Sequence, residues 1–272
     1  MQTITLNTGA KIPVIGFGTW RIWPSARAEK AVMQALNVGY RHIDTARIYG
    51  NERGVGRGIA KSGVNRKEIF VTTKLWNLDQ GYDSSLRAFD ASLKRLGLDY
   101  VDLYLIHWPA TNKRHESWRA LEEIHKSGRA RAIGVSNYTV RHLQELLGSS
   151  KIVPAVNQVE FHPFLYKQQA PLLEYCMQHK IIVEAHSPLA HAERINDPVI
   201  TGIAEKIGKT NAQVMLRWAM QYGTVLLPKS THVERMRENI DIFDFALDKA
   251  AMQRLDELSD GDHTTWDPSN VT

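Results

Sequence analysis

Four side chains able to hold or transfer a proton lie at the ends of apolar runs or in the loops that follow them: Asp44, Tyr49, Lys74 and His107. A phenol has an ordinary pKa of about 10, but a nearby ammonium group favours the phenolate and lowers that value. Lys74 can supply the ammonium, and Asp44 can hold Lys74 in place and keep it charged. Tyr49 could then protonate a carbonyl oxygen that gains negative charge, while His107 orients the carbonyl.

Each of these residues also has a plainer interpretation. An Asp, Lys or His at a strand end is as often part of a structural ion pair as it is a catalyst. All four at strand ends or in adjoining loops favour catalysis, so we predict a catalytic group of Tyr49, Lys74, Asp44 and His107.

A second polar set follows the apolar run at residues 224–227. Lys229 and Ser230 precede a helix expected to begin near Val233, so backbone N–H groups, a hydroxyl and a cation meet there, as an anion site requires. Arg235 adds planar, paired donors suited to phosphate. The alternative is a solvated basic helix face.

These residues are spread along a chain in which apolar runs alternate with helical spacing. The runs cover residues 14–17, 40–43, 69–72, 101–106, 130–135, 155–156, 181–185 and 224–227, and helical spacing covers residues 28–36, 86–96, 118–125, 140–147 and 212–222. Such alternation predicts parallel pairing, which a doubly wound sheet would also satisfy. Eight units favour an α/β fold closed into a (β/α)8 TIM barrel, whose catalytic groups converge at the carboxyl ends of the strands.

The remaining segments fit one domain over residues 1–272. The chain has 272 residues, and a barrel alone typically takes about 250. Residues 3–6 and 11–13, around the turn at residues 7–9, predict an N-terminal β-hairpin that caps one mouth. Residues 249–258 predict an additional C-terminal helix, followed by a polar tail that contains Trp266.

Composition narrows the class of protein. With 43% hydrophobic and 23% charged residues, the chain can bury a substantial core. The net charge of +5 is modest and the basic residues are dispersed, so no nucleic-acid partner is expected. No apolar stretch approaches the roughly 20 residues of a membrane span, and no leader segment is visible. The single cysteine, Cys176, lies among apolar residues and is expected to be a packing thiol in a cytoplasmic protein.

Two other ligand classes are not favoured. His42, His107, His162 and His186 raise the possibility of zinc-dependent hydrolysis, but the chain has no H-E-x-x-H motif and no H-x-H after the first strand, so no metal site is predicted. Gly54, Gly56 and Gly58 do not form G-x-G-x-x-G directly between a strand and a helix. That segment is expected to begin a helix.

Five stretches resemble the aldo-keto reductases, in the family's order and across the chain. They are GFGTW at 16–20, HIDTARIYGNE at 42–52, LIHWP at 105–109, GVSN at 134–137 and LPKS at 227–230. The resemblance implies a monomeric NADPH-dependent reductase in which Tyr49 is the acid, Lys74 and Asp44 tune it, and His107 positions the substrate. Its prokaryotic branch, with 2,5-diketo-gluconate and methylglyoxal reductases, is the most similar, because the connections at 109–116 and 189–197 and the tail are short.

The same resemblance implies the binding residues. Ser136, Asn137 and Gln158 hold the nicotinamide carboxamide, and Lys229, Ser230 and Arg235 hold the 2′-phosphate. The full expected cofactor set is Gly18, Thr19, Trp20, Asp44, Ser136, Asn137, Gln158, His186, Ser187, Pro188, Leu189, Lys229, Ser230, Thr231, Arg235, Glu238 and Asn239. The expected substrate set, for a small carbonyl compound, is Trp20, Tyr49, Trp76, His107 and Trp108.

One position departs from the family pattern. Most relatives have a tyrosine where this chain has His186, and that ring stacks on the nicotinamide. Imidazole offers less area and would repel NADP⁺ if protonated, so we predict that His186→Tyr tightens NADP⁺ binding. A second hypothesis for the protein is a redox-sensing barrel that binds NADPH with vestigial catalysis, and turnover separates the two.

Overall fold

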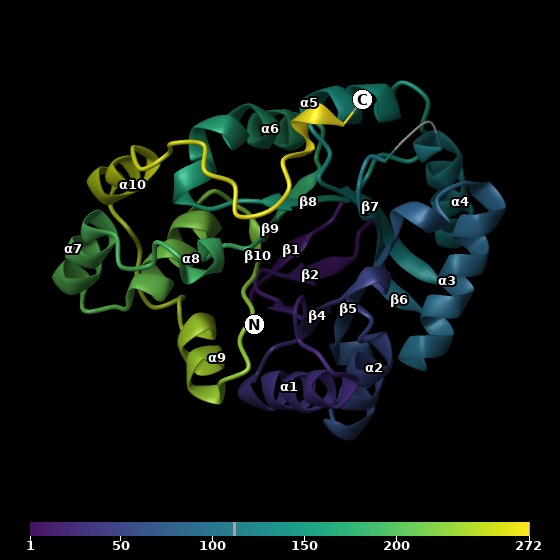
Figure 1. Ribbon diagram of the computed structural model, residues 1–272, viewed down its shortest axis with the longest axis horizontal. Coiled ribbons are helices and arrows are strands. Elements are labelled where there is room, and N and C mark those ends of the chain that lie inside the picture. Colours follow the sequence, from purple (N-terminus) through teal and green to yellow (C-terminus); the bar gives the residue numbers. More distant parts are fainter. Residues whose placement is uncertain (111–112, 272) are drawn as a thin grey trace.

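The computed structural model of the protein describes residues 1–110 and 113–271, and its eight parallel strands surround a central core with helices outside them (Figure 1). Each strand pairs in parallel with the next along the chain. The strands are β3 (Phe17–Gly18), β4 (His42–Asp44), β5 (Phe70–Leu75), β6 (Val101–Ile106), β7 (Ala130–Ser136), β8 (Val156–Glu160), β9 (Ile182–His186) and β10 (Val225–Leu227).

The first strand returns to the last and closes the sheet. The Gly16 amide donates to the Leu226 carbonyl at 2.7 Å, and the Leu226 amide donates to the Val14 carbonyl at 2.9 Å. Of the expected strand at 14–17, residues 14–16 form the hydrogen bonds that close the barrel. Regular pairing with β4 covers only Phe17 and Gly18. The predicted (β/α)8 barrel is confirmed.

Helices connect successive strands and pack around the barrel. They are α1 (Ser25–Val38), α2 (Glu52–Lys61), α3 (Tyr82–Leu96), α4 (Arg114–Lys126), α5 (Val140–Leu147), α6 (Tyr166–Gln178), α7 (Pro198–Ile207), α8 (Asn211–Gln221), α9 (Val233–Ile240) and α10 (Lys249–Asp256). α10 is the expected additional C-terminal helix, two residues shorter than its apolar spacing suggested. No helix within the described residues is both long and apolar enough to span a bilayer.

The N-terminal hairpin closes the amino end of the barrel. β1 (Thr3–Thr5) pairs antiparallel with β2 (Lys11–Pro13). Leu6 and Ile12 are buried in a cluster with Phe70, Leu103 and Val225 from the barrel strands. The hairpin therefore leaves the opposite end of the barrel, at the carboxyl ends of the strands, as the place for a ligand.

Glycines on α2 serve helix packing. A Cβ atom on Gly54 would lie 2.1 Å from the Ser25 carbonyl oxygen, and one on Gly56 would lie 1.9 Å from the Leu96 carbonyl oxygen. Their absent side chains let α2 approach α1 and the end of α3, which accounts for them without a phosphate-binding loop.

Candidate active site

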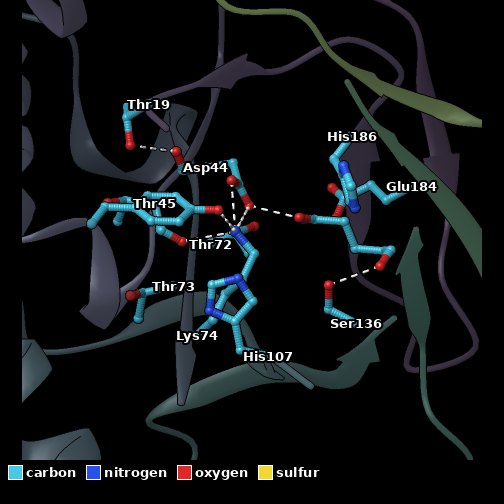
Figure 2. Close-up of polar contacts among 12 residues, drawn as sticks. Thr19, Asp44, Thr45, Thr72, Thr73, Lys74, His107, Ser136, Glu184 and His186 are labelled. Atoms are coloured by element: carbon cyan, nitrogen blue, oxygen red, sulfur yellow. Dashed lines mark hydrogen bonds and ion pairs between the residues drawn. The ribbon is translucent and has the colours of Figure 1, made fainter. Parts of the chain in front are cut away.

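The four predicted catalytic residues meet at the carboxyl ends of β4, β5 and β6. The Lys74 Nζ lies 2.7 and 2.8 Å from the two carboxylate oxygens of Asp44 and donates to the Thr45 carbonyl at 3.0 Å (Figure 2). The same Nζ lies 3.3 Å from the phenol oxygen of Tyr49, at the end of a short 3₁₀ turn, η1 (Arg47–Tyr49). Lys74 is fully buried, so its ammonium group contacts the Tyr49 phenol from the protein interior.

The electrostatics keep Lys74 charged and Tyr49 protonated. Burial opposes the charge of Lys74, but Asp44 and Tyr49 favour it, and the net effect raises the pKa of Lys74. The surrounding protein raises the pKa of Tyr49 by desolvation, against the lowering effect of Lys74. The expected downward shift of the Tyr49 pKa is therefore wrong, because desolvation and the Asp44 carboxylate act in the other direction.

His107 follows β6 and is a neutral imidazole. Burial, followed by Lys74 and His186, holds the pKa of His107 well below its usual value. Its Nδ1 has no hydrogen-bond partner among the described residues. Its ring lies edge-on to Tyr49 at 5.7 Å and to Trp76 at 5.5 Å between centroids. A neutral ring in this place can donate one hydrogen bond to a substrate oxygen.

A cavity of about 1020 Å³ opens above these residues. Its aromatic side contains every residue of the expected substrate set, Trp20, Tyr49, Trp76, His107 and Trp108. The Trp20 and Tyr49 rings lie 4.8 Å apart, and Trp108 lies 5.9 Å from Trp266 of the tail. The connection at 109–116 adjoins this wall, and its residues 111–112 lie outside the described residues.

Polar amides form the opposite side of the cavity. Ser136 Oγ donates to the Gln158 carbonyl at 2.8 Å, and Asn137 Nδ2 donates to the His107 carbonyl at 3.0 Å. Gln158 Nε2 donates to Asp44 at 2.9 Å and to Glu184 at 2.8 Å, so its amide orientation is fixed by two carboxyl groups. Such a set of oriented hydroxyl and amide groups fits the carboxamide of a nicotinamide.

His186 ends β9 between the amides and the following loop. Its ring nitrogens lie 3.2 Å from Asn137 Oδ1 and 3.3 Å from Ser187 Oγ. Burial lowers the pKa of His186 to about 4, helped by Lys74 and opposed by the Glu160 carboxylate. The ring is therefore neutral near pH 7, and the repulsion of NADP⁺ considered from the sequence does not arise.

The far end of the cavity is positively charged. Partial burial and the nearby Arg27 and Arg21 lower the pKa of Lys229, as expected where cations gather. A Cβ atom on Gly18 would lie 3.2 Å from the Leu227 carbonyl oxygen, so this glycine allows β3 and the β10 end to approach closely. Lys229, Ser230, Thr231, Arg235, Glu238 and Asn239 all line this end.

Of the expected cofactor set, Thr19 alone lies behind the cavity wall, where its hydroxyl donates to the Asp44 carbonyl at 2.8 Å. Gly18, Trp20, Asp44, Ser136, Asn137, Gln158, His186, Ser187, Pro188 and Leu189 line the cavity. The sequence interpretation missed Arg21, His191, His232 and the tail segment 263–265, which line it too. Arg21 follows Trp20 directly and could have been found, whereas the tail carries no strand or helix signal that would place it.

In the described part of the chain, no three His, Cys, Asp or Glu residues are placed to hold a metal ion. Cys176 is buried and its pKa is raised by burial to about 12, which makes it a packing thiol.

A barrel with a lysine-supported tyrosine beside a cavity lined by cations is typical of a carbonyl oxidoreductase. The sequence profile of the Aldo/keto reductase family matches residues 14–260, and the chain belongs to that family. It is 48% identical to a glyoxal reductase of Bacillus subtilis, over 99% of this chain and 97% of that protein. It is also 48% identical to a 9,11-endoperoxide prostaglandin H2 reductase of Trypanosoma cruzi, over 98% of this chain and 95% of that protein.

A solved structure supports the same assignment. The Bombyx mori aldo-keto reductase in complex with NADP superposes with a TM-score of 0.92 at 37% identity, covering 97% of this chain and 94% of that one. The protein is therefore an oxidoreductase of a family that includes NADP-bound structures.

Proposed function

We propose that the protein is an NADPH-dependent reductase that converts small aldehydes and ketones, such as methylglyoxal or 2,5-diketo-gluconate, into alcohols. The observation that carries this proposal is the Lys74 Nζ, 3.3 Å from the Tyr49 oxygen and held by Asp44 at 2.7 Å, beneath an aromatic cavity. The relatives named as reductases support it.

The chain's own residues hold and move the proton. Tyr49 donates its phenol proton to the carbonyl oxygen as that oxygen gains negative charge, and Lys74 stabilises the phenolate left behind. His107, as a neutral imidazole, donates a hydrogen bond that orients the same oxygen. When bound, NADPH supplies the hydride that adds to the carbonyl carbon.

Residues that line the cavity would hold the cofactor. Ser136, Asn137 and Gln158 would orient the carboxamide, and the His186 ring, which lines the same cavity, would stack on the nicotinamide. Lys229, Ser230 and Arg235 receive the 2′-phosphate, which favours NADPH over NADH. We further propose a monomer in the cytoplasm.

Turnover with a small panel tests the proposal. NADPH consumption is followed with methylglyoxal, 2,5-diketo-gluconate, an aromatic aldehyde and a steroid ketone, with NADH in parallel. We expect turnover of the small carbonyls with NADPH. Binding of NADPH without turnover of any compound would contradict the assignment and favour a regulatory barrel.

Tyr49→Phe isolates the proton donor. Since general acid catalysis contributes about 10²- to 10⁴-fold, we expect kcat to fall by that factor with an unchanged Kd for NADPH. Stopped-flow kinetics and fluorescence titration measure the two quantities, and a variant as active as the natural protein would exclude Tyr49 as the acid.

A further inference from the structure

One buried carboxylate outside the catalytic group is saturated with hydrogen bonds. Glu160, the last residue of β8, is 3% exposed. Its Oε1 accepts from His162 Nε2 at 3.0 Å, from the Thr264 amide at 2.8 Å and from the Thr264 hydroxyl. Its Oε2 lies 3.2 Å from His263 Nδ1 and accepts from the Thr265 amide at 3.3 Å and hydroxyl at 2.7 Å. All of these partners except His162 belong to the C-terminal tail.

Glu160 stays ionised in this setting. Burial alone would raise its pKa, but the hydrogen bond with His162, the nearby His186 and the Thr264 and Thr265 hydroxyls hold the pKa of Glu160 well below its usual range. A buried carboxylate is costly unless it is fully hydrogen-bonded, and the tail supplies most of the donors.

The tail is fixed on both sides of this carboxylate. Before it, the Asp260 and Gly261 amides donate to the Phe164 carbonyl, each at 3.1 Å. After it, Arg141 donates to the Val271 carbonyl, which lies 2.9 Å from His142 Nε2 of α5. The yellow tail in Figure 1 runs from α10 across the barrel end to α5.

Trp266 follows the anchored threonines directly. Its side chain is 73% exposed, lies 5.9 Å from the Trp108 ring and lines the cavity. Because most of this side chain is exposed, we infer that its position depends on the adjacent anchor.

We propose that Glu160 is a positioning residue that anchors residues 263–265 at the barrel mouth. It thereby places Trp266 against Trp108, so that the two rings form a wall for aromatic carbonyl substrates. This inference rests on the proposed reductase function for its effect on substrates, but not for the anchor. Glu160 lies outside the proton-transfer group and sets which substrates the pocket holds.

The anchor is tested by amide exchange in the intact protein. In Glu160→Gln an amide NH₂ replaces one carboxylate oxygen, so it faces N–H and O–H donors instead of accepting from them. We expect the backbone amides of Thr264 and Thr265 to exchange at least about tenfold faster. Thr265→Val, which removes a tail hydroxyl and leaves β8 intact, should accelerate the same amides less.

A matched control comes from Glu122 on α4. Its Oε1 accepts the amides of Lys151 at 2.7 Å and Ile152 at 2.9 Å, far along the chain from the tail. Glu122→Gln should accelerate exchange at Lys151 and Ile152 and leave the tail unchanged. Unchanged exchange at Thr264 and Thr265 in Glu160→Gln would overturn the anchor.

Kinetics test the effect on substrates. In Glu160→Gln, KM for an aromatic aldehyde should rise about fivefold or more, while kcat with methylglyoxal and the Kd for NADPH stay within about twofold. The double variant Glu160→Gln/Trp266→Ala should have nearly the same KM for the aromatic aldehyde as Trp266→Ala alone, because both substitutions remove the same wall. Faster amide exchange at Thr264 and Thr265 together with an unchanged KM for the aromatic aldehyde would overturn the positioning role. A natural protein that turns over no carbonyl would refute the proposed function and leave the exchange result standing.

Discussion

Tyr49 illustrates how the environment of a single residue suits it to the role proposed above. The phenol keeps its proton because desolvation raises its pKa, while Lys74 at 3.3 Å stabilises the charge that appears only when the proton leaves. An acid that is protonated at rest and supported as it ionises suits donation to a developing alkoxide better than a standing phenolate would.

His186 provides a second residue-scale prediction. Because its pKa is lowered to about 4, the ring is neutral near pH 7, and its charge should not weaken the proposed NADP⁺ binding. His186→Tyr should tighten NADP⁺ about threefold to tenfold, as expected from the roughly 0.5–1.5 kcal/mol of an aromatic pair.

The pH dependence separates stacking from charge. Fluorescence titration gives the Kd for NADP⁺ of the natural protein and of His186→Tyr. The first value divided by the second should stay constant between about pH 6 and about pH 8. A ratio that shrinks as pH rises would mean that His186 is protonated at the acidic end, and equal affinities would count against stacking.

Glu184 predicts a pH-dependent stability. Burial and then the Asp44 carboxylate raise the pKa of Glu184 from 4.5 to about 8. Between these values the folded chain keeps a proton that the unfolded chain has released, so this group's contribution to stability falls as pH rises. Glu184→Gln removes the titration, and its stability relative to the natural protein should therefore improve from about pH 5 to about pH 8.

Urea unfolding at the two pH values measures that difference. Other titrating groups cancel in the comparison, since both proteins carry them. A relative stability that is the same at both pH values would show that Glu184 ionises normally.

At the scale of elements, helix α2 depends on its glycines. Gly56→Ala would place a Cβ 1.9 Å from the Leu96 carbonyl oxygen, so α2 and α3 would have to separate. Overpacking of this kind costs about 1–3 kcal/mol, and we expect at least that loss in the free energy of unfolding.

Gly202 on α7 is the matched control. It is exposed, and a Cβ there would meet nothing within 4 Å. Gly202→Ala should therefore be neutral or stabilising by up to about 1 kcal/mol. Equal effects of the two substitutions in chemical denaturation would show that helix propensity, and not packing, governs α2.

The elements also show how far the sequence could be interpreted. Helix α5 matches its predicted range of 140–147, because the Thr139 capping box fixes its start. The apolar run at 155–156 is shorter than the strand it predicts. β8 continues through Asn157, Gln158 and Glu160, whose polar side chains interrupt the apolar pattern. Asn157 bonds the backbone of Tyr138, Gln158 bonds Asp44 and Glu184, and Glu160 bonds the tail. Only the folded chain brings these partners together.

The whole molecule concentrates positive charge at one end of the cavity. Arg21, Arg27, Lys229 and Arg235 lie in the loops and helices there, within a chain of net charge +5. The arrangement favours an anionic ligand over a neutral one and makes its binding sensitive to salt.

Arg235→Leu tests that arrangement. The Kd for NADPH should rise about tenfold or more, as for the loss of a charged hydrogen bond, while the Kd for NADH stays unchanged. Added salt should weaken NADPH binding less in the variant. Equal losses for both cofactors, by calorimetry, would place the 2′-phosphate elsewhere.

The N-terminal hairpin, which closes one end of the barrel, has a consequence for protein engineering. Leu6 and Ile12 seal the amino end of the barrel against Phe70, Leu103 and Val225, whereas the cavity lies at the other end. We propose that residues 1–272 form one domain whose two ends can be altered separately. Loops and tails from other barrels could then be exchanged around the mouth to change substrate preference, with the sealed end left untouched as a stable scaffold.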